Sequence, residues 1–206
     1  MNLEKLQIAQ QDFLLAFPEG FQHPKMLEVG KKHKMDKMIE FAQEVFNKPA
    51  FNQTDKILEN WVKLVSRSSM VSMFEKPRFK EMVNDLSAQE REQLADGLYE
   101  FLYGDQQRGF EQQLDILIHY KLAKWSLISI APAYVSPQKE VFVKPTTAKG
   151  VIKYFDLQGV EYKAKPSWAF YQEYRKQILV MSDFVDSGLK PNTAAFCGFL
   201  MMSLPK

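Results

Sequence analysis

Three titratable side chains at helical spacing are the first candidates for catalysis or metal binding. Glu111, Asp115 and His119 follow one another at intervals of four residues, so a helix would place them on one stripe beside its apolar face. Two carboxylates and an imidazole can hold a divalent cation. One helix seldom completes such a site, and the sequence identifies no ligand on another helix. The alternative is a charged helix edge on which His119 pairs with Asp115.

Lysines interleaved with aromatic residues in the C-terminal half form a second candidate site. A helix over residues 147–156 that buries Ala148, Val151, Ile152 and Phe155 would point Lys149 and Lys153 outward. A helix N-terminus flanked by lysines suits a phosphate group, and an exposed aromatic ring can stack on a base. The predicted nucleic-acid-binding residues are Lys144, Lys149, Lys153, Lys163, Lys165, Trp168 and Arg175.

The distribution of charge along the chain supports this second candidate. Residues 1–118 hold 15 Lys and Arg against 19 Asp and Glu, whereas residues 119–206 hold 12 against 6. A basic surface on one side of a protein attracts phosphates. The same composition is also typical of a solvated lysine-rich face or of a surface that binds another protein, and both alternatives remain open.

Motifs for other chemistry are absent from the sequence. No serine lies in a Gly-x-Ser-x-Gly elbow, and the nine glycines are scattered without forming a phosphate loop. The single cysteine, Cys197, lies in an apolar setting that favours an inert buried thiol. We therefore assign no catalytic residue, expect no cofactor, and favour a binding protein over an enzyme. A metal-dependent enzyme that uses the Glu111, Asp115 and His119 stripe is the alternative.

The elements that must position these residues are helical. Apolar residues recur at helical spacing in nearly every segment. We predict a compact all-α fold of eight or nine helices. The predicted helices cover about residues 3–17, 24–48, 54–74, 88–103, 107–126, 147–156, 167–186 and 193–203. Residues 131–140, which include two prolines, are predicted to be a loop, and residues 141–143 a short extended piece.

The chain of 206 residues is expected to form one domain, with residues 131–140 as the boundary if the helices divide into two lobes. The longest uncharged run, residues 125–138, is too short for a membrane span, so we expect a soluble cytoplasmic protein with no membrane partner. The helix over 193–203 is apolar around most of its circumference. It should be buried in the core or in a subunit interface, which leaves a protein partner or a homodimer open.

Two short resemblances involve the basic segment. Residues 142–149, Phe-Val-Lys-Pro-Thr-Thr-Ala-Lys, followed by Tyr162, Pro166, Trp168 and Tyr171, resemble a segment shared by an uncharacterised group of bacterial helical proteins. Residues 145–157 are similar to the helix of helix-hairpin-helix DNA glycosylases that begins Val-Asp-Thr-His-Val and ends Arg-Leu-Gly-Leu. Pro145 occupies the place of that family's catalytic aspartate, and no Leu-Pro-Gly-x-Gly hairpin precedes it. The resemblance implies a DNA-associated helical scaffold without glycosylase chemistry.

Overall fold

The computed structural model describes residues 1–205, and all regular structure in that range is helical, which confirms the all-α prediction. The eleven α-helices of the described range are α1 (Leu3–Ala16), α2 (Pro24–His33), α3 (Met35–Val45), α4 (Thr54–Arg67), α5 (Glu75–Asp85), α6 (Ala88–Tyr103), α7 (Gln106–His119), α8 (Trp125–Val135), α9 (Pro145–Tyr154), α10 (Trp168–Ser182) and α11 (Thr193–Met202). Short 3₁₀ turns lie at Gly20–Gln22, Lys48–Asn52 and Ser187–Leu189.

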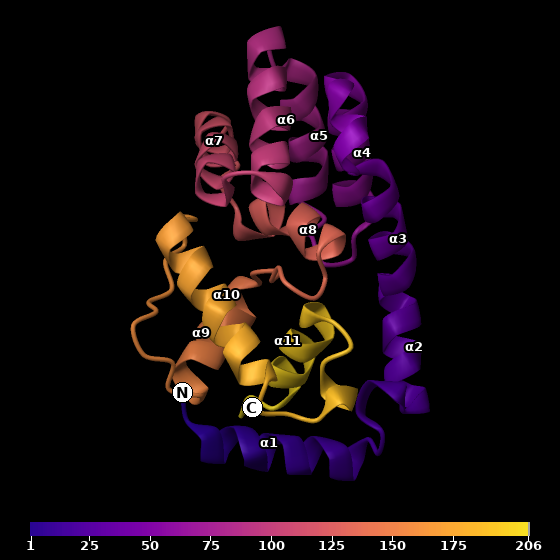
Figure 1. The fold of residues 1–206 in the computed structure, drawn as a ribbon, viewed down its shortest axis with the longest axis vertical. Helices are drawn as coiled ribbons and strands as arrows, with labels where there is room; N and C mark the ends of the chain where they lie inside the picture. Colours follow the sequence, from indigo (N-terminus) through magenta and orange to yellow (C-terminus); the bar gives the residue numbers. More distant parts are fainter. Residues whose placement is uncertain (206) are drawn as a thin grey trace.

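The helices form two groups that α8 joins (Figure 1). Helices α4 to α7 stand side by side in the upper part of the view, and α9, α10 and α11 gather in the lower part. Helix α1 lies across the lower end, and α2 and α3 run up one side to reach α4. The segment after α8, residues 136–144, carries the chain from the upper group to the lower one.

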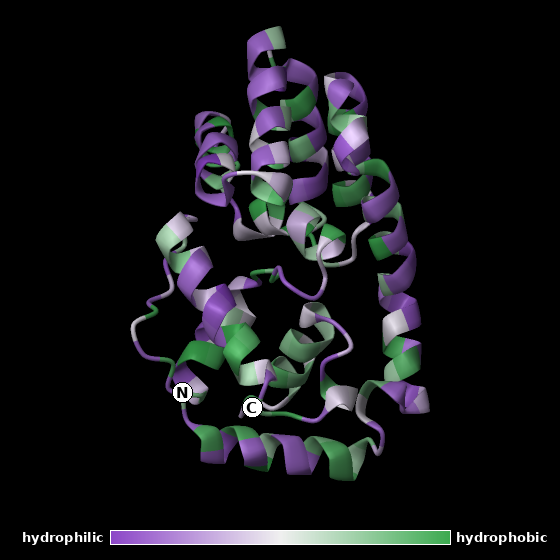
Figure 2. Cartoon of the chain, in the orientation of Figure 1, coloured by the Kyte–Doolittle hydropathy of each residue, from purple (hydrophilic) through white to green (hydrophobic). Residues whose placement is uncertain are grey.

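One continuous hydrophobic core extends through both groups, from Leu6 on α1 to Leu200 on α11. Helix α8 lies within it, since every residue from Trp125 to Tyr134 is buried. In Figure 2, hydrophilic colour dominates the visible ribbons of α5 and α6, whereas α11 shows mainly pale to green shades. Helix α11 buries Phe196, Phe199 and Leu200 but leaves Met201 and Met202 exposed. The predicted burial of α11 therefore holds for one face.

Helices α6 and α7 form the most extensive helix pair. A capping box starts α6, because the Ser87 Oγ accepts from the Glu90 backbone N–H and the Glu90 carboxylate accepts from the Ser87 N–H. The two helices approach closely where Gly109 of α7 meets α6. A Cβ at Gly109 would lie 2.5 Å from the Gly97 carbonyl oxygen and closer still to the Phe101 backbone nitrogen. Glycine is therefore required here by the backbone of the neighbouring helix.

The single helix predicted over residues 24–48 is wrong, because the chain breaks at Lys34. This residue has φ 52° and ψ 34°, and its N–H donates to the carbonyls of Gly30 and Lys31 at the end of α2. Gly30 weakens the last turn of α2, because glycine has a low helix propensity. The left-handed residue ends α2, and α3 then starts at Met35 and buries Met38 and Ala42.

The predicted helix over residues 54–74 is also too long, and one helix was missed. Helix α4 ends at Arg67, and Ser68 becomes extended, with its Oγ hydrogen-bonded to the Tyr134 hydroxyl at 3.0 Å. The chain then starts α5 at Glu75. Pro77 lies in the first turn of α5 instead of ending α4, at a position where a helix does not need the missing N–H.

The predicted loop over residues 131–140 is helical in its first half. Helix α7 stops at His119, short of the predicted 126, and Lys121 adopts a left-handed conformation with φ 56°. Helix α8 then runs from Trp125 to Val135 and contains Pro132. Packing on all sides stabilises this helix despite the proline, so tertiary contacts override the local signal. Within residues 1–205, no helix is long and apolar enough to cross a membrane.

Candidate anion-binding surface

Helix α9 presents two lysines on its outer side. Thr147, Ala148 and Val151 are buried, which leaves Lys149 and Lys153 exposed one turn apart. The predicted face is therefore confirmed, except that Ile152 is only half-buried. Lys144 is the N-cap residue; its side chain makes no capping hydrogen bond and is exposed.

The loop after α9 brings further lysines to the same helix. The Lys149 ammonium lies 4.9 Å from the centre of the Tyr162 ring, so the loop passes beside α9. The Trp125 indole Nε1–H donates to the Lys163 carbonyl over 2.8 Å and anchors the loop to α8. The side chains of Lys163 and Lys165 are exposed. We call Lys144, Lys149, Lys153, Lys163 and Lys165 the α9 lysine surface.

The positive charge of this surface is largely uncompensated by neighbouring carboxylates. Among residues 1–205, none of its five lysines forms an ion pair with a carboxylate. Asp156 is instead paired with Lys5 at 3.1 Å. Hydrogen bonds from Lys5 and then from Asn2 hold the pKa of Asp156 below its usual value, so this carboxylate stays ionised on Lys5. Glu161, in the loop itself, is exposed and also lacks an ion pair in the described range.

Arg175 and Trp168 do not lie free on the surface, contrary to the expectation from the sequence. Trp168 is half-buried and packs on Phe110, with ring centres 5.7 Å apart. The Arg175 guanidinium carbon lies 5.7 Å from the centre of the Trp168 ring, and its side chain is only 16% exposed. The reason is a buried carboxylate, Glu140, which lies 2.6 Å from the Arg175 Nη1.

Glu140 is the centre of a polar cluster that joins four segments. Its two carboxylate oxygens accept from the Arg175 Nη1 at 2.6 and 2.7 Å, from the Tyr171 hydroxyl at 2.8 Å, and from the Gln106 Nε2 at 2.9 Å. Its backbone carbonyl accepts from the Thr193 Oγ1 at 2.6 Å. The cluster thus ties α7, α10 and α11 to the segment between α8 and α9.

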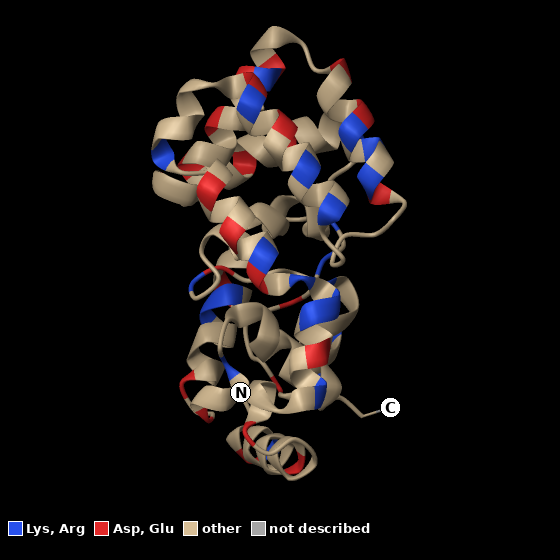
Figure 3. Cartoon of the chain, turned by 90° about the vertical axis from the view of Figure 1, so that its right-hand side faces the viewer, with Lys and Arg blue, Asp and Glu red and all other residues tan. Residues whose placement is uncertain are grey.

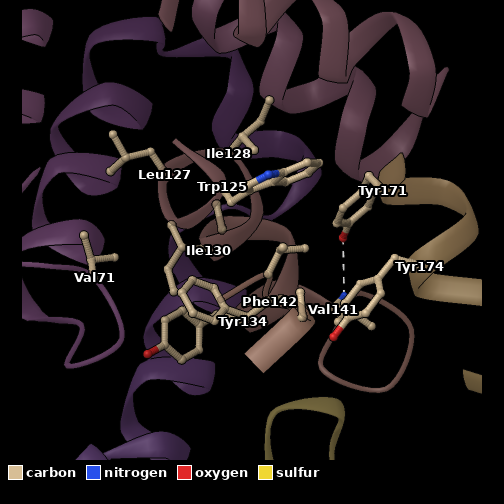
Figure 4. Packing of buried hydrophobic residues seen from close by; sticks show 14 of the residues in the cluster. Val71, Trp125, Leu127, Ile128, Ile130, Tyr134, Val141, Phe142, Tyr171 and Tyr174 are labelled. Carbon is tan, nitrogen blue, oxygen red and sulfur yellow. Dashed lines mark hydrogen bonds between the residues drawn. The ribbon is translucent and has the colours of Figure 1, made fainter. Parts of the chain in front are cut away.

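Tyr171 is held rigidly in this cluster. Its hydroxyl also accepts from the Val141 N–H at 3.3 Å, which Figure 4 shows as a dashed line beside the ring of Tyr174. Burial, and then the nearby Glu140 carboxylate, raise the pKa of Tyr171 well above its usual value. The phenol therefore stays protonated and keeps its donor role. The cluster satisfies buried polar groups, and we assign it a structural role.

The Glu111, Asp115 and His119 stripe does not form a metal site. All three side chains are exposed on α7, and the Glu111 carboxylate accepts from the Gln107 Nε2 at 2.9 Å. The described residues contain no group of three or more His, Cys, Asp or Glu side chains placed to hold a metal ion. The predicted pairing of His119 with Asp115 is likewise not found in this range. The His119 ring lies against Tyr120 instead, at 4.9 Å between centres.

The Cys197 thiol is shielded, although the residue is not fully buried as the sequence setting predicted. The residue as a whole is half-buried, but burial of the thiol raises its pKa to about 12. We expect a disulfide reagent at pH 8 to label the folded protein slowly and the denatured protein at once, because the thiolate is the reactive form. The measurement is the release of the coloured thiol with and without denaturant. Equal rates would contradict the buried thiol.

Comparisons with family models, with curated protein sequences and with solved structures give no match to this chain. The two short resemblances seen in the sequence therefore stay predictions. Sequence reasoning missed Lys5, which removes Asp156 from the α9 lysine surface and lies 5.3 Å from the Tyr154 ring centre. No local pattern could have revealed it, since about 150 residues separate these partners along the chain.

Proposed function

We propose that this protein is a non-enzymatic binding protein and that its ligand is nucleic acid, held through the α9 lysine surface. The observation that carries the proposal is the set of five exposed lysines on α9 and its following loop, without a paired carboxylate in residues 1–205. Lysines without local partners retain their full attraction for phosphates and release counterions when they bind them.

Two further features support a phosphate backbone as the ligand. The first turn of α9 has no side-chain cap, so its backbone N–H groups add a partial positive charge beside Lys144. Tyr162 adds an aromatic ring to the same basic surface, with the Lys149 ammonium 4.9 Å from its centre. Arg175 and Trp168, which the sequence included in this site, do not belong to the proposed contact surface, because Arg175 pairs with Glu140.

A double substitution tests the proposal. We expect Lys149→Gln together with Lys153→Gln to weaken binding to a mixed-sequence DNA duplex about tenfold at low salt, because two phosphate contacts are lost. The measurement is fluorescence anisotropy of a labelled duplex. Lys31→Gln together with Lys32→Gln is the matched control, since both lysines are exposed on α2 and the change in charge is the same. Equal weakening in both variants, or no binding by the unmodified protein, would end the proposal.

Protein interaction is the second candidate, and exposed apolar side chains favour it. Val180 and Phe184, at the end of α10, are 43% and 52% exposed. Met201 and Met202, at the end of α11, are also exposed. A partner protein or a second copy of the chain could cover these side chains. Concentration-dependent sedimentation would reveal self-association, and the nucleic-acid proposal would survive only if the DNA assay succeeds.

A further inference from the structure

A second group of basic residues lies in the N-terminal half of the chain, on helices α4 to α6. A groove of about 510 Å³ lies between α4 and α5 and is lined by Lys63 and Arg67 of α4, Lys80 and Asn84 of α5, and Arg91 of α6. Figure 3 views the molecule from the side that carries α2, α3 and α4, and blue segments recur along its upper helices. The N-terminal half of the chain is acidic overall, so its composition gives no indication of this groove.

The basic side chains of the groove differ in whether their positive charge is neutralised. Arg91 is neutralised and fixed, because its Nη2 lies 2.7 Å from the Asp55 carboxylate and its Nη1 donates to the Val83 carbonyl over 2.8 Å. The Arg67 guanidinium carbon lies 5.2 Å from the centre of the Phe41 ring of α3, a contact that leaves its charge uncancelled.

The remaining two cations, Lys63 and Lys80, are exposed and form no ion pair within residues 1–205. The one carboxylate that lines the groove directly is Glu59. Two lysines and an arginine against one carboxylate leave the groove with an excess of positive charge. Like charges gathered in one place raise the free energy of the empty groove, and a bound anion would lower it.

We propose that this groove binds a small anion that carries several phosphate groups. The groove is partly open to solvent, so a bound ion would keep part of its hydration. Lys63, Arg67 and Lys80 supply the charge, and the Ser66 hydroxyl and the Asn84 amide supply neutral donors on the same walls.

A nucleic-acid strand fits this groove less well than a compact polyphosphate. No aromatic side chain lines the groove to stack a base, which is the contact that single-stranded nucleic acids use most. The proposal is therefore independent of the α9 lysine surface, and either site can exist without the other.

Calorimetric titration with inorganic tripolyphosphate tests the groove. We expect saturable binding, and at least about tenfold weaker binding after Lys63→Gln together with Lys80→Gln, since two charge-assisted contacts are removed. Lys31→Gln together with Lys32→Gln makes the same change in charge on α2, outside both proposed sites, and should leave the affinity within about twofold. Circular dichroism of each variant establishes that the helices are intact.

Two results would overturn the assignment. One is the absence of saturable binding to the unmodified protein at low salt. The other is an equal loss in both double variants, which would mean that tripolyphosphate follows net charge and not the groove. DNA binding by the Lys63→Gln and Lys80→Gln variant should be unchanged. Loss of tripolyphosphate binding alone therefore tests the groove, and the DNA assay with the unmodified protein separately tests the proposed function.

Discussion

Replacement of Arg175 by methionine is expected to lower the free energy of unfolding by about 3–5 kcal/mol. Arg175 supplies the only positive charge in direct contact with the Glu140 carboxylate among residues 1–205, and Glu140 is 6% exposed. Methionine fills a similar length, so the cost arises from a buried carboxylate that keeps its bonds to Tyr171 and Gln106 but loses its counter-ion. Urea unfolding followed by circular dichroism measures the change.

A second variant distinguishes the loss of stability caused by charge from the loss caused by packing. Adding Glu140→Gln to Arg175→Met removes the unpaired carboxylate, so the double variant should recover at least half of the loss. If Arg175→Met alone costs less than about 1 kcal/mol, the cluster is no more important than an exposed ion pair, and its assigned role in joining α7, α10 and α11 is wrong.

Replacement of Gly109 by alanine is expected to destabilise the protein by about 2–3 kcal/mol. The new Cβ would meet the backbone of α6 at Gly97 and Phe101, and backbone atoms cannot move away as a side chain can. Helices α6 and α7 must therefore separate along their shared face, although alanine itself favours a helix. Thermal unfolding measures the loss.

Gly30 is the matched control for this substitution. It lies on α2, and a Cβ there would meet no atom within 4 Å. Gly30→Ala should therefore stabilise the protein by about 0.5–1 kcal/mol through helix propensity alone. Destabilisation by Gly30→Ala, or a neutral Gly109→Ala, would contradict the close approach of α6 and α7.

The sequence predicted the fold class and the outward faces of helices because both depend on local periodicity. Lys149 and Lys153 point outward as Ala148 and Val151 require, and α6 covers the predicted range 88–103. These features depend on residues within one or two turns of each other, so they are readable without the tertiary structure.

The wrong predictions concern positions whose structure depends on residues far away along the chain. Pro132 indicates a loop locally, but burial on all sides keeps it in α8. Arg175 resembles a surface cation on its own helix, and only the path of the segment after α8 brings Glu140 to it. The Glu111, Asp115 and His119 stripe failed for the opposite reason, because no other element approaches its exposed side with further ligands in the described range.

The salt dependence of DNA binding tests the proposed function most directly. If all five lysines of the α9 lysine surface contact phosphates of a duplex, log K should fall with log salt concentration with a slope of about −4.5. The Lys149→Gln and Lys153→Gln variant should give a slope of about −2.7, because two contacts are missing. No detectable binding at low salt, or a slope that the double substitution leaves unchanged, would contradict nucleic-acid binding through this surface.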